Sequence, residues 1–197
     1  MIIDFDVDIN NYIENILTFF GFWKYLCPCC GSKNSLIRHA KYERYIYLFE
    51  NNVFICHTVA ILRLKCKSCS TTHAILPADM IPYKIFSFTC IRICLTGYFI
   101  QEMSGPEISL MHRLSVQMVY LFINEYLDEQ ASCINFLKAG DLDMLEKPCT
   151  DPGKILMLIN AHFSGSYFLR SYFMHTRQVF LMRRKHDPLS KALWVGG

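Results

Sequence analysis

Two short cysteine motifs, Cys27-Pro28-Cys29-Cys30-Gly31 and Cys66-Lys67-Ser68-Cys69, stand at either end of a segment rich in β-branched and aromatic residues. Each motif holds one C-x-x-C pair, which forms a tight turn that points two sulfurs at one place. Four thiolates around one ion make the closed shell of structural zinc. Gly31 can adopt the positive φ that turns backbone N–H groups towards sulfur. The sequence therefore predicts a structural Zn²⁺ site formed by Cys27, Cys30, Cys66 and Cys69, with no open position for a catalytic water.

Other interpretations of the cysteines stay open. The four residues could be buried by chance, or one pair could be a thioredoxin-type redox motif, although no βαβ pattern surrounds it. His73 follows Cys69 by four positions and could replace one thiolate. Among the ten cysteines, five show no pairing and are expected to be small core residues: Cys56, Cys90, Cys94, Cys133 and Cys149.

The segment between the motifs predicts a β-hairpin. Residues 44–49 and 53–65 are rich in Ile, Val, Tyr and Phe, and Glu50-Asn51-Asn52 between them favours a turn. Residues 10–22 show apolar side chains at helical spacing and predict an amphipathic helix. The fold class is therefore α+β, with an N-terminal helix in residues 1–24 and a zinc ribbon in 25–80.

The rest of the chain shows helical periodicity and is expected to form an all-helical part, divided into residues 81–139 and 140–197. Helices are predicted to begin near Pro82 and Pro106, and a third to run over 116–128 after a turn at 113–115. Asp151-Pro152 favours an N-cap followed by a helix through residue 162, and a last helix is predicted over 167–185. The two predicted helices on either side of residues 113–115 suggest a helix-turn-helix.

The composition excludes several classes of protein. With 52% apolar and 19% charged residues the chain is not a disordered one, and a net charge of +3 is too small to imply nucleic acid by itself. The longest uncharged piece of the most apolar stretch, residues 93–100, is too short to cross a membrane. The N-terminus shows no secretory pattern. We therefore expect a cytoplasmic protein with reduced cysteines and no membrane contact.

The chain shows a family resemblance over residues 25–127. The cysteine frame, His39-x-x-Tyr42-x-Arg44 and Thr72-His73-Ala74-Ile75-Leu76-Pro77 together resemble uncharacterised bacterial zinc-ribbon proteins found with transposons and integrases. More loosely, they are similar to the zinc-ribbon and helix-turn-helix heads of transposases. The resemblance implies DNA-associated work in a mobile-element context, and it brings no known activity with it.

The residues themselves offer a candidate DNA surface. Six cations interleaved with tyrosines in the hairpin segment could contact phosphates: Arg38, Lys41, Arg44, Arg63, Lys65 and Lys67. In the third predicted helix, Val119, Phe122 and Ile123 would face the core, while Gln117 and Asn124 could reach base edges. That helix carries no Lys or Arg over 116–128, so it could equally serve packing or protein contact. A second basic stripe, Arg170, Arg177 and Arg184, lies in the last predicted helix.

No motif for catalysis is found, because the acidic residues of the C-terminal half cluster in a linker and no phosphate-binding glycine loop is present. We expect a non-enzymatic DNA-binding or accessory protein of a mobile element that functions in transposition or recombination. The alternative is an interaction subunit that docks on a recombinase, a transposase or another complex. A truncated transposase without its catalytic domain is a third hypothesis. The oligomeric state is left open.

Overall fold

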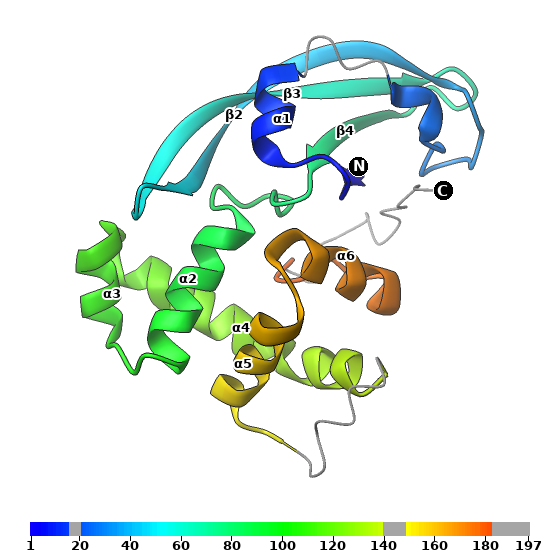
Figure 1. The fold of residues 1–197 in the computed structure, drawn as a ribbon. Helices are drawn as coiled ribbons and strands as arrows, with labels where there is room; N and C mark the ends of the chain where they lie inside the picture. Colours follow the sequence, from blue (N-terminus) through cyan, green and yellow to red (C-terminus); the bar gives the residue numbers. More distant parts are fainter. Residues whose placement is uncertain (16–20, 140–148, 183–197) are drawn as a thin grey trace.

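The computed structural model describes residues 1–15, 21–139 and 149–182. The fold of these residues is α+β, with a four-stranded sheet in the order β1-β4-β3-β2 and six α-helices. In Figure 1 the two long strands arch over one side of the molecule, and the helices from α2 to α6 lie on the other side.

A long antiparallel hairpin dominates the sheet. Strand β2 spans Leu36–Glu50 and β3 spans Val53–Cys66, and the two pair along their whole length. Asn51 and Asn52 form the turn with φ values of 48° and 65°, which asparagine tolerates better than other side chains. The predicted hairpin and its turn are therefore confirmed, and β2 begins earlier than the sequence indicated.

Two short strands complete the sheet at the end remote from the turn. Strand β4 (Thr72–Pro77) pairs antiparallel with β3, and β1 (Ile2–Asp4) pairs in parallel with β4. Helix α1 (Ile9–Asn15) packs on this end, where the hydroxyl of Tyr12 donates to the carbonyl oxygen of Ile75 and accepts from the N–H of Leu62. A short 3-10 helix, η1 (Gly21–Lys24), follows. The predicted helix over 10–22 is confirmed only in its first part.

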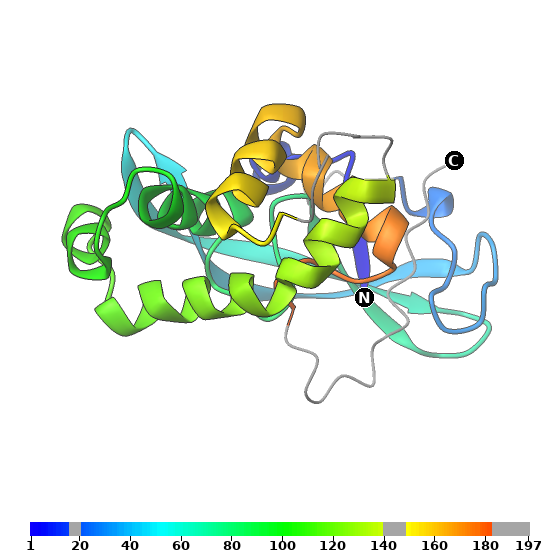
Figure 2. The ribbon, with the colours of Figure 1, turned by 90° about the horizontal axis from the view of Figure 1, so that it is seen from below.

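The helical part begins with α2 (Phe88–Phe99), α3 (Gly105–His112) and α4 (Val116–Ala139). Helices α5 (Pro152–His162) and α6 (Gly165–Thr176) follow. Ser104 caps α3 in a reciprocal capping box with Glu107, and Asp151 caps α5 as predicted. Figure 2 shows α4 running along the helical layer, with α5 and α6 packed beside it.

Three predicted helix boundaries are wrong. The helix predicted over 116–128 continues to Ala139. Pro82 lies in a turn, where Tyr83 has a φ of 64°. Helix α2 begins at Phe88, and its N-cap is Ser87, whose side chain accepts a hydrogen bond from the N–H of Cys90. The helix predicted over 167–185 ends at Thr176, because Arg177 adopts a left-handed conformation with a φ of 56°. Arg184, the last member of the predicted basic stripe, lies outside the described residues.

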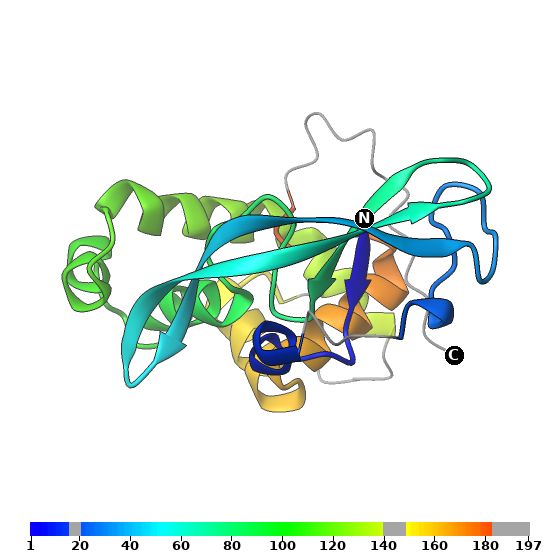
Figure 3. The same cartoon turned by 90° about the horizontal axis from the view of Figure 1, so that it is seen from above.

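The hydrophobic core consists of two clusters. One lies between the sheet and α1, and it includes Ile2, Tyr12, Ile61 and Leu64. The other gathers residues of all the helices from α2 to α6, so the predicted regions 81–139 and 140–197 share one apolar core. Phe49 and Phe54 at the hairpin turn pack against this second cluster, and Figure 3 shows the hairpin crossing above the helices. Within the described residues, no helix is both long and apolar enough to cross a membrane.

Candidate metal centre

Four cysteine side chains converge at the base of the long hairpin. The Sγ atoms of Cys27, Cys30, Cys66 and Cys69 all lie within 4.8 Å of one another. Two of the Sγ–Sγ separations are 3.6 Å, between Cys27 and Cys69, and 3.7 Å, between Cys30 and Cys66. Sulfurs bound tetrahedrally at the usual zinc–sulfur distance of about 2.3 Å lie about 3.8 Å apart. The four residues are therefore close enough to bind one metal ion, and their separations suit zinc.

The two C-x-x-C turns have the same backbone hydrogen bonds. In the first turn, Gly31 N–H donates to the carbonyl of Cys27 and Cys27 N–H donates to that of Ser32, at 2.8 and 3.1 Å. In the second turn, the N–H of Ser70 donates to the carbonyl oxygen of Cys66, and the N–H of Cys66 donates to the carbonyl oxygen of Thr71, both at 2.9 Å. The residue after the second cysteine has positive φ in each turn, 70° at Gly31 and 60° at Ser70. The chain thus builds two matching halves of one site.

The sheet fixes the relative position of the two halves. Leu36, the first residue of β2, pairs with Cys66, the last residue of β3. The N–H of Lys67 donates to the carbonyl oxygen of Ser35 at 2.8 Å, which extends the contact into the second turn. The hairpin register therefore holds the first motif against the second.

Polar side chains surround the sulfurs. His73 on β4 places Nε2 3.3 Å from Cys27 Sγ, and Ser35 places Oγ 3.3 Å from Cys66 Sγ. Burial raises the pKa of the Cys27 thiol, whereas the hydrogen bond with Ser35 lowers the pKa of Cys66. Burial also lowers the pKa of His73 to about 4, so its imidazole is neutral at physiological pH. Cys66 is therefore the more readily ionised of the two buried thiols.

All ten cysteines are free thiols, and those outside the site differ in their environment. Cys90, Cys94 and Cys133 are buried core residues, as predicted. Cys56 is exposed, so the prediction that it fills the core is wrong. It lies on β3 opposite Tyr47, and its neighbours Ile55 and His57 are only half-buried.

The hairpin register divides the predicted DNA contacts between two faces. A β-bulge at His39 places Arg38 opposite Leu64 and Lys41 opposite Leu62, so Arg38 and Lys41 share a face. Arg63 and Lys65 alternate with those leucines along β3, and their side chains lie on the other face. Lys67 is exposed in the second cysteine turn.

Arg44 belongs to the same face as Arg63, because it pairs with Val59. Its guanidinium donates to the carbonyl oxygens of Ile81, at 3.2 Å, and of Lys84. Arg63 donates to Thr72 Oγ1 at 2.7 Å. The sequence alone did not show that these two cations contact neighbouring segments of their own chain.

Helix α4 carries the two predicted base contacts. Gln117 and Asn124 are exposed, while Val119, Phe122 and Ile123 are buried as predicted. Residues seven apart in a helix lie on one stripe, so Gln117 and Asn124 point to the same side. Residues 113–115 connect α3 to α4, and Ser115 Oγ accepts from the N–H of Met118 at 3.2 Å as an N-cap.

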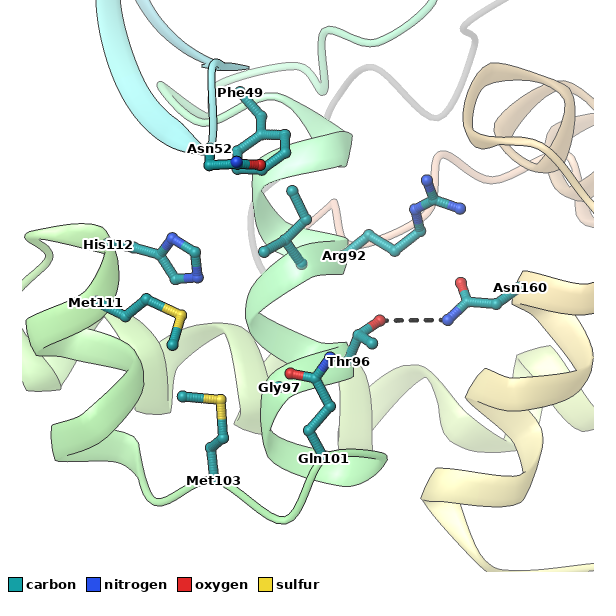
Figure 4. Close-up of a pocket in the computed structure, with 11 residues that line it drawn as sticks. Phe49, Asn52, Arg92, Thr96, Gly97, Gln101, Met103, Met111, His112 and Asn160 are labelled. Atoms are coloured by element: carbon teal, nitrogen blue, oxygen red, sulfur yellow. Dashed lines mark hydrogen bonds between the residues drawn. The ribbon is translucent and has the colours of Figure 1, made fainter.

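A hollow of about 510 Å³ lies over α2, between α3 and α5 (Figure 4). Asn160 donates from Nδ2 to Thr96 Oγ1 at 3.2 Å across it. Among the described residues, two of the three buried side-chain polar atoms without a partner belong to its lining, namely His112 Nδ1 and Asn160 Oδ1. The described lining residues include Arg92 and His112 but no carboxylate or thiol.

A family described as "Domain of unknown function (DUF6431)" matches residues 27–114. The match runs from the first cysteine of the site to the turn after α3 and covers less than half of the chain. No curated protein and no solved structure was found to match.

Proposed function

We propose that this protein is a zinc-stabilised, non-catalytic DNA-binding or accessory protein of a mobile genetic element that functions in transposition or recombination. The observation that supports the proposal most strongly is the cluster of four cysteines at the base of a long hairpin. In this proposal residues 25–80 form a zinc ribbon whose closed sulfur shell contributes folding energy and no chemistry.

The hairpin face that carries Arg38, Lys41 and Tyr45 is the proposed phosphate-binding surface. All three residues are exposed, and Tyr45, four residues after Lys41 on the same strand, exposes 64% of its surface. Glu43 lies on the same face and reduces its net charge. Lys67 extends the basic surface to the metal end. Cations beside aromatic rings contact backbone phosphates and unstacked bases.

In the same proposal, α3 and α4 form a helix-turn-helix. Gln117 and Asn124 would reach base edges from α4, since a glutamine or asparagine amide can bond adenine. Phosphate contacts would come from the hairpin, because the described residues of α4 include one cation, Lys138, at its far end.

The test is binding of the zinc-loaded full-length protein to labelled duplex DNA over a series of salt concentrations. Backbone contacts release counterions, so the affinity should fall steeply as salt rises. Binding that is absent at low salt, or that does not change with salt, would contradict the proposal.

The alternative function is docking on a recombinase, a transposase or another protein complex, and one observation favours it. Leu110 and Met111 on α3 expose 84% and 58% of their surface, and Tyr120 on α4 exposes 42%. Large apolar side chains that are exposed together on neighbouring helices are more typical of protein-binding surfaces than of DNA-binding surfaces. Replacing Leu110 and Met111 with serine should abolish partner binding and leave DNA affinity unchanged if this face is a protein-docking surface.

A further inference from the structure

The four cysteines of the metal site differ in their access to water. The side chains of Cys27 and Cys66 expose 0% of their surface, whereas Cys30 is exposed and Cys69 is half-buried. Four thiolates around one divalent cation leave a net charge of −2. Water can solvate the outer sulfurs, but the two inner sulfurs must receive hydrogen bonds from the protein to avoid a desolvation cost.

Each inner sulfur has one buried polar side chain beside it. His73 exposes 4% of its surface and places Nε2 3.3 Å from Cys27 Sγ. Ser35 exposes 6% and places Oγ 3.3 Å from Cys66 Sγ. The two come from different elements, β4 and the segment before β2, and they approach opposite halves of the site.

His73 is placed as a donor rather than as a ligand. The group of ligand atoms that lie within 4.8 Å of one another contains the four sulfurs and not the His73 ring. An imidazole Nε2–H at 3.3 Å from a thiolate is at hydrogen-bond distance for sulfur. In this structure the Ser35 hydroxyl donates to the carbonyl oxygen of Ser32, at 3.1 Å, and accepts from the Cys66 thiol. Once Cys66 is a metal-bound thiolate it has no proton to donate, and the Ser35 hydroxyl can turn its proton to Cys66 Sγ.

We infer that His73 and Ser35 are positioning residues of the metal site, each donating a hydrogen bond to one of the two buried thiolates. The inference rests on the proposed zinc site and adds to it two residues that orient the sulfurs and offset their charge. Hydrogen-bond partners of metal ligands commonly change metal affinity 10–100-fold when they are removed.

The experiment uses the full-length protein loaded with Zn²⁺ or Co²⁺. His73→Met removes the donor at similar volume, His73→Gln keeps an N–H at similar reach, and Ser35→Ala removes only a hydroxyl. His112→Met is the matched control, because it removes a partly buried imidazole that stacks on Phe54 away from the cysteines. Zinc affinity is measured by chelator competition, and the Co²⁺ spectrum reports both the ligand set and the energy of thiolate-to-metal charge transfer.

We expect His73→Met and Ser35→Ala each to weaken zinc binding by roughly 10–100-fold. Their charge-transfer bands should shift to lower energy with a tetrahedral four-sulfur ligand field retained, and His73→Gln should restore most of the affinity. Unchanged affinity and spectrum in both variants would overturn the inference. A ligand field that shows loss of a nitrogen ligand in His73→Met would also overturn it, since His73 would then bind the metal directly.

Two outcomes separate this inference from the proposed function. A wild-type protein that binds neither ion overturns the zinc site and the inference together. A wild-type protein that binds zinc tightly, with variants that bind it equally well, overturns the inference alone. If His73→Met does not fold, Ser35→Ala and the recovery in His73→Gln decide the result.

Discussion

Lys84 and Glu125 form an ion pair, with 2.6 Å between Nζ and Oε2, that joins the loop before α2 to the middle of α4. The two side chains expose only 14% and 9% of their surface. The carbonyl oxygen of Lys84 also accepts a hydrogen bond from Arg44 on β2. This loop therefore connects the hairpin to the helical core through side chains as well as through the chain itself.

Replacing Lys84 with methionine should destabilise the protein by about 3–5 kcal/mol, because Glu125 would keep a buried charge without its cation. The double variant Lys84→Met/Glu125→Leu should recover most of this loss, since both charges are then removed. The free energy of unfolding is measured by urea titration. Lys154→Met, at an exposed position on α5, is the control and should change stability by less than about 0.5 kcal/mol. If Lys154→Met lowered the free energy of unfolding as much as Lys84→Met does, the stabilising role of the ion pair would be contradicted.

Asp79 makes the stability depend on pH. Its Oδ1 atom accepts from the N–H and hydroxyl of Thr89, at 3.1 and 3.2 Å, and burial raises the pKa of its carboxyl to about 6. A carboxyl whose pKa is higher in the folded state stabilises the fold below its unfolded pKa, near 3.8, and loses that contribution as pH rises through about 6.

The stability of the wild-type protein should therefore fall relative to that of Asp79→Asn between pH 4 and pH 7, by up to about 3 kcal/mol. Unfolding titrations of both proteins across this range give the difference directly, because other titrating groups contribute equally to each. Parallel stability curves for the two proteins would show that Asp79 does not titrate in this range.

Removal of the metal should unfold the base of the hairpin. Structural zinc contributes ~10–16 kcal/mol in small zinc-binding peptides, and here the site joins β2 to β3 where two cysteine turns face each other. Elemental analysis should find one zinc per chain, and a chelator should reduce the β signal in circular dichroism. Cys66→Ser should abolish zinc binding, whereas Cys56→Ser, at an exposed cysteine outside the site, should keep it. Unchanged spectra after chelation would contradict the prediction.

The cysteine spacing and the turn residues were enough to predict the metal cluster and the hairpin. Gly31 was predicted to have positive φ from its residue type, and its φ is 70°. Ser70 holds the equivalent place in the second turn with a φ of 60°, but serine carries no such signal. Local patterns therefore reveal one half of the site more clearly than the other.

Features that depend on tertiary contact could not be predicted. The bulge at His39, which moves Arg38 and Lys41 to one face, follows from strand pairing and has no marker in the sequence. Pro82 suits a helix start, yet Phe86 bridges to Tyr47 on β2 and delays the helix to Phe88. Strand β1 has three residues, Ile2–Asp4, and exists because β4 offers a free edge. Each is fixed by a partner distant in the chain.

Arg44→Met should lower stability and leave the DNA affinity of the folded protein unchanged. The guanidinium bonds the carbonyl oxygens of Ile81 and Lys84, and its loss leaves both acceptors without this partner. The expected cost is about 1–3 kcal/mol in the free energy of unfolding. A loss of DNA affinity at a temperature where the variant is fully folded would instead assign Arg44 to the DNA surface.

Lys41→Glu should weaken DNA binding and reduce its salt dependence. Lys41 is exposed on the face with Arg38 and Tyr45, and a lost phosphate contact reduces the slope of log affinity against log salt by about one. Arg63→Glu tests the opposite face of the hairpin with the same charge change. Fluorescence anisotropy of a labelled duplex measures both variants at several salt concentrations. A larger effect of Arg63→Glu would move the DNA surface to that face, and equal binding by wild type and both variants would favour the protein-docking function.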